Sequence, residues 1–239
     1  MILSIHQPSY FPWLGLLNKI AKSDIYLVMD EVQLSDSAFQ NRNLFLSPEG
    51  KAKYLTIGFN KNDYFSRRFC DLEITQADWQ EKHLNMLKSY YGKHRFFYEV
   101  MPFIEPVFHN VYSLLFEPVI ESMRISMGLL DISTKIVYQH ELEYERTAKK
   151  NDLVLALVQA IGADIYLAGT GSKNYMQLQA FEAQGIHVEF NHFVHPEYPQ
   201  NKLSQFEPGI SCLDLLFNVG IERGREIFWH ALHAEAKNA

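Results

Sequence analysis

The sequence predicts an α/β fold in which a mainly parallel, Rossmann-like sheet carries helices on both faces and a helical insertion. Three observations support this prediction. Short, continuous apolar runs such as residues 25–29 are typical of strands buried on both faces of a parallel sheet. These runs alternate with segments of helical periodicity, and turns rich in glycine, proline or polar residues separate the two. With 239 residues, 47% of them hydrophobic, the chain is long enough for one such domain spanning 1–239.

The first thirty residues predict a strand, a helix and a second strand. Residues 2–5 are apolar and β-prone, and residues 24–29 form a second apolar run. Between them, Leu14, Leu17 and Ile20 recur at helical spacing. A proline-containing turn joins the first strand to this helix, which places the turn where α/β proteins usually bind ligands.

A polar segment at residues 31–50 predicts a loop that ends in a hairpin turn at 47–50. Two short strands are expected after it. The run 54–57 is apolar, and residues 69–74 alternate between apolar and polar side chains as a half-buried strand does.

Residues 77–128 predict a helical subdomain beside the sheet. Asp78 is placed to cap its first helix, and Gly92 to end it. Two further helices are expected around 98–112 and 113–127, separated by turn and proline features.

From residue 131 onward the pattern again alternates between strands and helices. A helix is expected over 151–161, ended by Gly162, and another runs through Phe181 after a glycine-rich turn at 169–173. Such alternation implies right-handed crossovers between parallel strands. The strands expected in the one sheet are 2–5, 24–29, 134–138, 164–168 and 186–190.

Composition excludes some classes of function. A net charge of −6 and a pI near 5.9 argue against a general nucleic-acid-binding surface. Cys70 and Cys212 are expected to be two reduced core cysteines, with a disulfide between them as the alternative. The first residues lack a signal-peptide pattern, and no run approaches the ~18 apolar residues of a membrane span, so we expect a cytoplasmic protein.

His6 is the candidate general acid or base, because its ordinary pKa near 6.5 suits proton transfer and it ends the first strand. Asp30 ends the second strand and is expected to orient His6 if the two strands are neighbours. Gln7, Tyr10 and Trp13 follow in the same turn as candidate substrate-binding residues. The alternatives are a buried, satisfied histidine and a turn that only caps and packs the first helix.

The turn at 169–173 predicts an anion site. Gly169 and Gly171 let backbone N–H groups approach a phosphate, and Lys173 supplies a positive charge. The spacing matches neither a P-loop nor the full dinucleotide-binding fingerprint. The alternative is a tight turn that needs glycine φ angles, with Lys173 in solvent.

Four polar residues in a row, Gln40, Asn41, Arg42 and Asn43, form a second candidate binding segment. Arg42 can bind phosphate or carboxylate through two N–H groups, and amides can bind sugar hydroxyls. We expect Arg42 and His6 to share one cleft. The alternative is an ordinary polar approach to a hairpin; if this segment is strand-like, alternate residues face opposite sides.

Several histidines are candidates for ligand contacts. The spacing of His187, His192 and His195 fits no recognised zinc pattern, so no metal site is expected. His195 is instead expected to line a pocket, together with Tyr198 and Gln200. His83 is expected to face the cleft from a helix. The neighbouring Trp79 is explained by core packing.

Seven motifs follow one another along the chain. They are His6-Gln7-Pro8-x-Tyr10-x-Pro12-Trp13-x-Gly15, Asp30-x-x-Gln33, Gln40-Asn41-Arg42-Asn43, Trp79-x-x-x-His83, Tyr166-Leu-Ala-Gly169-x-Gly171-x-Lys173-x-Tyr175, His195-Pro196-x-Tyr198-x-Gln200 and Ser211-x-x-Asp214-x-x-Phe217-Asn218-x-Gly220. Together they resemble, in order and over nearly the whole chain, the WbqC-like family, which is linked to bacterial O-antigen and other surface-polysaccharide gene clusters. The resemblance adds Tyr175 to the candidate site.

This resemblance implies an enzyme of surface-glycan (lipopolysaccharide) precursor modification. A histidine turn paired with a late Gly/Lys turn is similar, at fold level only, to class I synthetase and nucleotidyltransferase sites. It suggests transfer of an acyl, aminoacyl or nucleotidyl group to a nucleotide-linked amino sugar. The implied partner is thus a small molecule, with a nucleotide as the conceivable cofactor. The alternatives are a non-catalytic binding protein of the same pathway and a metal-dependent hydrolase. An enzyme would be favoured over a binding protein if one cleft contained His6, Asp30, Arg42 and Lys173.

Overall fold

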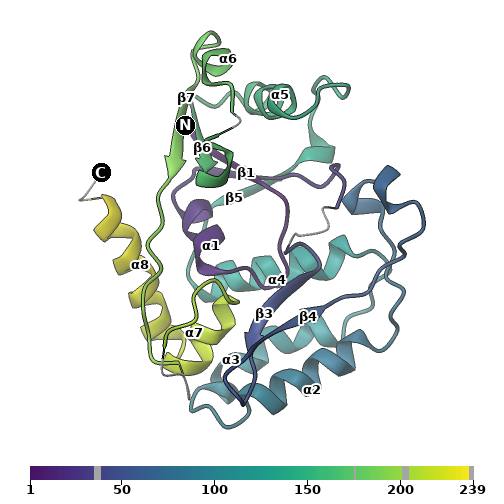
Figure 1. The fold of residues 1–239 in the computed structure, drawn as a ribbon, viewed down its shortest axis with the longest axis vertical. Helices are drawn as coiled ribbons and strands as arrows, with labels where there is room; N and C mark the ends of the chain where they lie inside the picture. Colours follow the sequence, from purple (N-terminus) through teal and green to yellow (C-terminus); the bar gives the residue numbers. More distant parts are fainter. Residues whose placement is uncertain (35–38, 175, 201–204, 237–239) are drawn as a thin grey trace.

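The computed structural model describes residues 1–34, 39–174, 176–200 and 205–236 (Figure 1). A five-stranded parallel sheet lies at its centre, in the order β5-β2-β1-β6-β7. The prediction of one parallel sheet is therefore confirmed. Its strands are β1 (Ile2–His6), β2 (Ile25–Val28), β5 (Lys135–Tyr138), β6 (Ile165–Gly169) and β7 (His187–Asn191).

The strand order places a topological switch point beside β1. After β1 the chain builds β2 and β5 on one side, and it then crosses to build β6 and β7 on the other. Leu3 of β1 is thus paired with Ile25 of β2 and with Tyr166 of β6. In open parallel sheets, ligands bind outside the carboxyl ends of the strands at such a point. The crevice here lies between the ends of β1 and β6.

Each face of the sheet has its own apolar core, because successive strand residues point to opposite faces. Leu3, Ile5 and Leu27 pack toward α5 (Asn151–Ile161) and α6 (Leu178–Glu182). Tyr26 and Val28 belong to a larger core on the opposite face, which includes α1 (Leu14–Ala21). The ribbon shows α5 and α6 on one side of the sheet and α1 on the other (Figure 1). Helices on both faces are therefore confirmed.

The helical block contains α2 (Trp79–Tyr91), α3 (Phe97–Ile104) and α4 (Phe116–Leu129). The predicted helix over 98–112 is wrong beyond residue 108, because a short 3₁₀ segment at Glu105–Phe108 ends it. The carboxylate of Glu117 then accepts hydrogen bonds from the backbone N–H groups of Ser113 and Leu114, both 2.8 Å, so these residues form the turn before α4.

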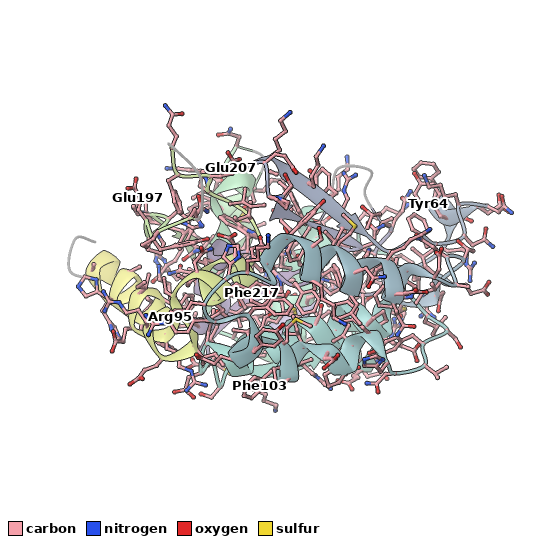
Figure 2. The ribbon with its side chains drawn as sticks, turned by 90° about the horizontal axis from the view of Figure 1, so that it is seen from below. Tyr64, Arg95, Phe103, Glu197, Glu207 and Phe217 are labelled. Atoms are coloured by element: carbon pink, nitrogen blue, oxygen red, sulfur yellow. The ribbon has the colours of Figure 1, made fainter. Side chains whose placement is uncertain are left out.

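This block continues the larger core. Phe217 of α7 (Cys212–Val219) is fully buried and stacks on Tyr91, with ring centroids 4.7 Å apart. Figure 2 shows Phe217 inside the molecule and Phe103 on its outer face. The last helix, α8 (Ile221–Ala236), is attached to the end of α4, because Trp229 donates to the carbonyl of Leu130 at 2.9 Å.

An antiparallel hairpin, β3 (Arg42–Leu46) and β4 (Ala52–Thr56), stands apart from the main sheet. Its turn at 47–50 is as predicted, but the loop expected over 31–50 is wrong for the residues of β3. The strand expected over 69–74 is wrong for residues 69–72, whereas Glu73 and Ile74 form isolated β-bridges with Leu114 and Phe59. Phe69 and Leu72 are both fully buried and three residues apart, which is the period of the 3₁₀ turn (Phe69–Asp71) found here.

Cys70 and Cys212 are both free, as expected. None of the helices in the described residues has both the length and the apolar character needed to cross a bilayer.

Candidate functional site

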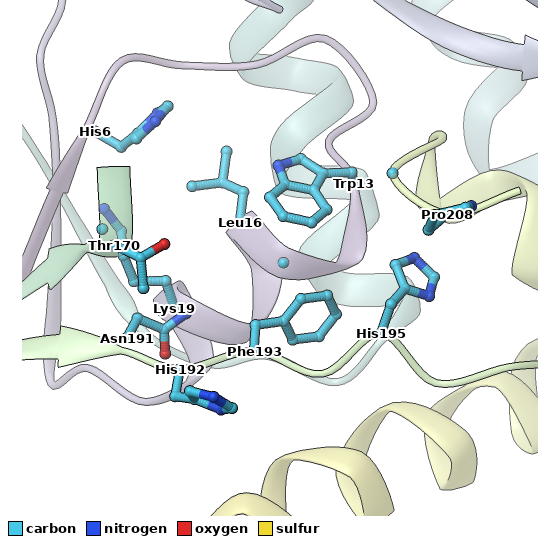
Figure 3. A pocket seen from close by; sticks show the side chains of 13 residues that line it. His6, Trp13, Leu16, Lys19, Thr170, Asn191, His192, Phe193, His195 and Pro208 are labelled. Carbon is cyan, nitrogen blue, oxygen red and sulfur yellow. The ribbon is translucent and has the colours of Figure 1, made fainter. Parts of the chain in front are cut away.

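Two cavities meet at the crevice between β1 and β6. Their volumes are about 560 Å³ and about 920 Å³, and His6, Lys19 and Gly169 line both of them. We call the first the aromatic cavity, because Trp13 and Phe193 line it (Figure 3), and the second the apolar cavity. The first turn and the glycine-rich turn therefore lie at the same edge of the sheet.

His6 is the last residue of β1; it is exposed toward both cavities, and neighbouring protein displaces part of the water around its ring. Nδ1 donates to the carbonyl oxygen of Gln7 at 2.8 Å, which leaves Nε2 as an acceptor. Burial, helped by the positive charge of Lys19, lowers the pKa of His6 to about 4. His6 is therefore a neutral imidazole at neutral pH.

Lys19 is the functional candidate that sequence reasoning missed. Lys19 is only 4% exposed, and its Nζ donates to the backbone carbonyl of Ile5 at 2.8 Å. No carboxylate among the described residues pairs with it. Burial lowers the pKa of Lys19 to about 8, which still leaves it mostly charged at neutral pH. The available signal was a lone basic residue inside the apolar helix Leu14–Ala21.

The glycine-rich turn borders the cavities through Gly169 and Gly171. Neither residue has a positive φ, so the alternative of a turn that needs glycine φ angles is wrong. A Cβ on either would meet no atom within 4 Å, so the missing side chains leave the backbone open to a ligand. Lys173 is not among the cavity-lining residues, and its Nζ lies 5.9 Å from the Phe190 ring. Tyr175 lies outside the described residues.

The amino end of α5 forms another wall of the apolar cavity. Asn151 accepts from the backbone N–H of Gln177 at 3.0 Å, while its buried Nδ2 has no hydrogen-bond partner among the described residues. Lys150, beside it, has φ 53° and ψ −120°, a strained conformation for a residue other than glycine. Among the described residues, neither cavity is lined by Asp or Glu, so the charge around the crevice is positive.

The aromatic cavity is built around Trp13. Its indole meets the Phe193 ring edge-on at 5.5 Å, and Phe193 meets His195 at 5.5 Å. A Cβ on Gly15 would lie 2.2 Å from the indole, so the glycine in the Trp13-x-Gly15 motif makes room for this ring. His195 donates from Nδ1 to the Pro196 carbonyl at 3.0 Å, and its buried Nε2 has no hydrogen-bond partner in the part of the chain that the structure describes.

Four other predicted site residues hold the structure together instead. The Tyr10 hydroxyl donates to Nδ1 of His83 at 3.0 Å, and both side chains are buried. The expectation that His83 faces the cleft is therefore wrong, because its Nε2 lies 3.2 Å from the Thr56 carbonyl in the core. Outside the two cavities, Tyr198 and Gln200 donate to a carboxylate oxygen of Asp214, at 3.0 and 3.2 Å.

The polar segment 40–43 serves mainly to fasten the hairpin. Gln40 donates to Gln7, and Asn41 donates to the Ile57 carbonyl at 2.9 Å. Asn43 is buried and donates to the Tyr10 and Phe11 carbonyls at 3.1 and 2.7 Å.

Arg42 points to the other side of the strand, over the ring of Tyr54 at 4.4 Å. It lines neither cavity, so the structure does not bring Arg42 and His6 into one cleft.

Asp30 has a different partner from the one predicted. Its fully buried carboxylate accepts from Nδ1 of His140 and, at 3.2 Å, from the His140 backbone N–H. The strand register explains this correction. Val28 is paired with Tyr138, so two residues further on Asp30 meets His140, not His6. Burial raises the pKa of Asp30, and the hydrogen bonds from His140 oppose this rise.

The described residues contain no group of three His, Cys, Asp or Glu side chains placed to hold a metal ion. A metal-dependent hydrolase would depend on a cluster of His187, His192 and His195. These side chains do not form a metal-binding group.

Comparisons with known proteins agree with the resemblance of the motifs. The sequence model of the WbqC-like protein family matches residues 7–226. Uncharacterized protein Rv1507c of Mycobacterium tuberculosis is 28% identical over 225 residues, which cover 92% of this chain and 94% of that protein. No solved structure matches the chain significantly.

Proposed function

The chain belongs to the WbqC-like protein family, and from this premise we propose that it binds a nucleotide-linked sugar in the crevice between β1 and β6. As part of the same proposal, it acts in the cytoplasm on precursors of surface glycans before their export. The observation that carries the proposal is Lys19, a buried ammonium group beside two cavities with no acidic lining among the described residues.

A buried ammonium group is costly unless a partner compensates for the lost water. Lys19 has three N–H donors and, within the described residues, a single hydrogen bond, to a backbone carbonyl. A phosphate at the crevice would supply both the missing charge and the missing acceptors. The open backbone at Gly169 and Gly171 and the unpartnered amide of Asn151 offer it further donors.

The two cavities narrow the class of ligand. Lys19 lies where they meet, so an anion bound there has space on both sides. On one side are the rings of Trp13 and Phe193, and on the other an apolar wall that includes Leu153 and Met176. A molecule with a central diphosphate and a group at each end fits this arrangement better than free phosphate does.

His6 supports a catalytic role within the same crevice. A neutral imidazole with a free Nε2 can take a proton from an attacking hydroxyl or amino group during acyl, aminoacyl or nucleotidyl transfer. The second candidate is a non-catalytic binding protein. It is favoured by the dispersal of the predicted residues, because Asp30 pairs with His140 and Arg42 lies outside both cavities.

Calorimetric titration with UDP-N-acetylglucosamine tests the binding proposal, after a thermal-shift screen of other nucleotide-linked sugars. Lys19→Met keeps the length of the side chain and removes its charge. We expect it to weaken binding by about 1.5–3 kcal/mol, the range for hydrogen bonds to charged groups, while the protein stays folded.

Lys173→Met is the matched control, because it removes a lysine from the neighbouring turn outside the cavities. Unchanged affinity in a folded Lys19→Met protein would refute the proposal. If the affinity falls only in Lys173→Met, the anion site lies at the glycine-rich turn, as predicted from the sequence. Once a transfer reaction is detected, His6→Gln should lower turnover by about 10²–10⁴-fold; full activity would favour binding alone.

A further inference from the structure

A third cavity, of about 720 Å³, opens at the carboxyl ends of β2 and β5. His140, Tyr144 and Arg146 line it from the segment after β5, and Glu31 and Arg68 line it from the opposite side. The proposed nucleotide-linked sugar does not occupy this cavity, since it shares no lining residue with the two at the β1–β6 crevice.

The geometry of His140 is that of an oriented acid–base group. Both oxygens of the Asp30 carboxylate are engaged by this one residue, one by Nδ1 and one by the backbone N–H at 3.2 Å. A carboxylate that accepts from Nδ1 fixes the tautomer and leaves the lone pair on Nε2. Within the part of the chain that the structure describes, Nε2 of His140 has no hydrogen-bond partner, and the side chain is 43% exposed at the cavity.

Neighbouring contacts hold the ring in place. It stacks on Tyr138, with centroids 5.5 Å apart and planes 20° apart, and Phe116 meets both rings edge-on, at 6.3 Å from His140 and 5.6 Å from Tyr138. The preceding residue, Gln139, accepts from the Glu31 backbone N–H at 3.2 Å and donates to the Tyr144 hydroxyl at 2.7 Å. The ring is therefore oriented before any ligand arrives.

The charges around this cavity cancel. Glu31 has a side chain only 6% exposed and accepts from Arg68 at 2.7 Å, from Arg146 and from Tyr144 at 2.9 Å. Arg68 also binds both oxygens of Asp71, at 2.6 and 2.9 Å. Two arginines thus balance two carboxylates, which disfavours a strongly charged ligand. Phe116 and Tyr144 add aromatic surface of the kind that packs against the apolar face of a sugar ring.

We propose that His140 and Asp30 form an acid–base dyad that binds and deprotonates a hydroxyl group of an uncharged, sugar-like ligand in this third cavity. The hydroxyl proton passes to Nε2, the electron pair of the broken O–H bond stays on the oxygen, and Asp30 balances the positive charge on the ring. The oxygen then attacks the carbonyl carbon of an activated acyl donor. The bond from that carbon to the donor's leaving group breaks, and the leaving group departs with the electron pair and takes the proton from Nε2. Lys19 takes no part in this step.

Nitrogen-15 NMR of histidine-labelled protein tests the orientation at a pH where the rings are neutral. We expect the wild-type His140 to carry its proton on Nδ1. In Asp30→Asn the amide nitrogen should replace the accepting oxygen and donate to Nδ1, which moves the ring proton to Nε2. Asp78→Asn, which removes a surface carboxylate paired with Lys82, should leave His140 unchanged. A wild-type ring protonated on Nε2 would overturn the proposal without any variant.

The same spectra identify the ligand class. Titration with N-acetylglucosamine, which is uncharged and rich in hydroxyls, should shift the Nε2 resonance of His140, and inorganic phosphate should not. Asp30→Asn should abolish the response, and His140→Gln should weaken sugar binding by about tenfold, as expected for loss of a buried hydrogen bond. A response to phosphate alone, or to neither compound, would contradict the proposal. Lys19→Met should leave the sugar response intact, which separates this test from that of the crevice.

Discussion

At the scale of single residues, Asp214 is a buried carboxylate held by neutral donors alone. Tyr91, Tyr198 and Gln200 donate to it at 2.9, 3.0 and 3.2 Å. Burial raises the pKa of Asp214 from 3.8 to about 6, against these hydrogen bonds. The folded protein therefore holds this proton more tightly than the unfolded chain, so the contribution of Asp214 to stability falls as the pH rises through this interval.

We predict that Asp214→Asn removes this pH dependence. Urea unfolding at several pH values between 4 and 7 should show the free energy of unfolding of the variant rising relative to wild type as the pH increases. Parallel curves for the two proteins would show that Asp214 titrates alike in the folded and unfolded states.

His6 changes the stability of the protein with pH in the opposite direction to Asp214. Its pKa falls from 6.5 to about 4, so the folded protein releases a proton that the unfolded chain keeps, and stability is lost as the pH falls through this range. An anion bound beside His6 should oppose this shift. We therefore predict proton uptake when UDP-N-acetylglucosamine binds near pH 5, measured by calorimetry in buffers of different ionisation enthalpy. His6→Gln should show no such uptake; equal uptake in both proteins would assign the proton to another group.

At the scale of elements, two helical glycines make a matched pair. Gly15 is in α1, where a Cβ would meet the Trp13 ring at 2.2 Å, whereas a Cβ on Gly128 in α4 would meet nothing within 4 Å. We predict that Gly128→Ala stabilises the protein by about 0.5–1 kcal/mol, the usual helical gain over glycine. Gly15→Ala should destabilise it and displace Trp13 from Phe193, weakening ligand binding in the aromatic cavity. Denaturant unfolding and tryptophan fluorescence provide the measurements, and equal stabilisation by both changes would show that the indole moves at no cost.

The errors of sequence reasoning are also found at this scale. The composition of segment 40–43 predicts a loop, because amides are common in loops. In the structure, Asn41 and Asn43 instead donate from their amides to backbone carbonyls of other segments. An alternating strand would turn Phe69 and Leu72, three residues apart, to opposite faces, and the packing of both into one core instead fits the 3₁₀ turn.

At the scale of the whole molecule, the apolar runs were enough to predict the parallel sheet, and with it the meeting of the His6 turn and the Gly169 turn. The partners of individual side chains could not be predicted in this way. Asp30 and His140 are 110 positions apart and meet only because β5 lies beside β2. The sequence does not single out Lys19, because sequence periodicity does not show that α1 turns this side chain toward the end of β1.

The central place of β1 has a consequence for how the protein is made. β1 is made before the other strands of the sheet and gains β2 after about twenty further residues, but its other neighbour, β6, begins only at Ile165. Until then one edge of β1 has unpaired N–H and C=O groups, which is the kind of edge that recruits other nascent chains. The long sequence separation between β1 and β6 also raises the contact order, which slows folding. Translation must therefore pass Ile165 before the crevice between β1 and β6 can exist, so shorter nascent chains present a half-built sheet to chaperones and proteases.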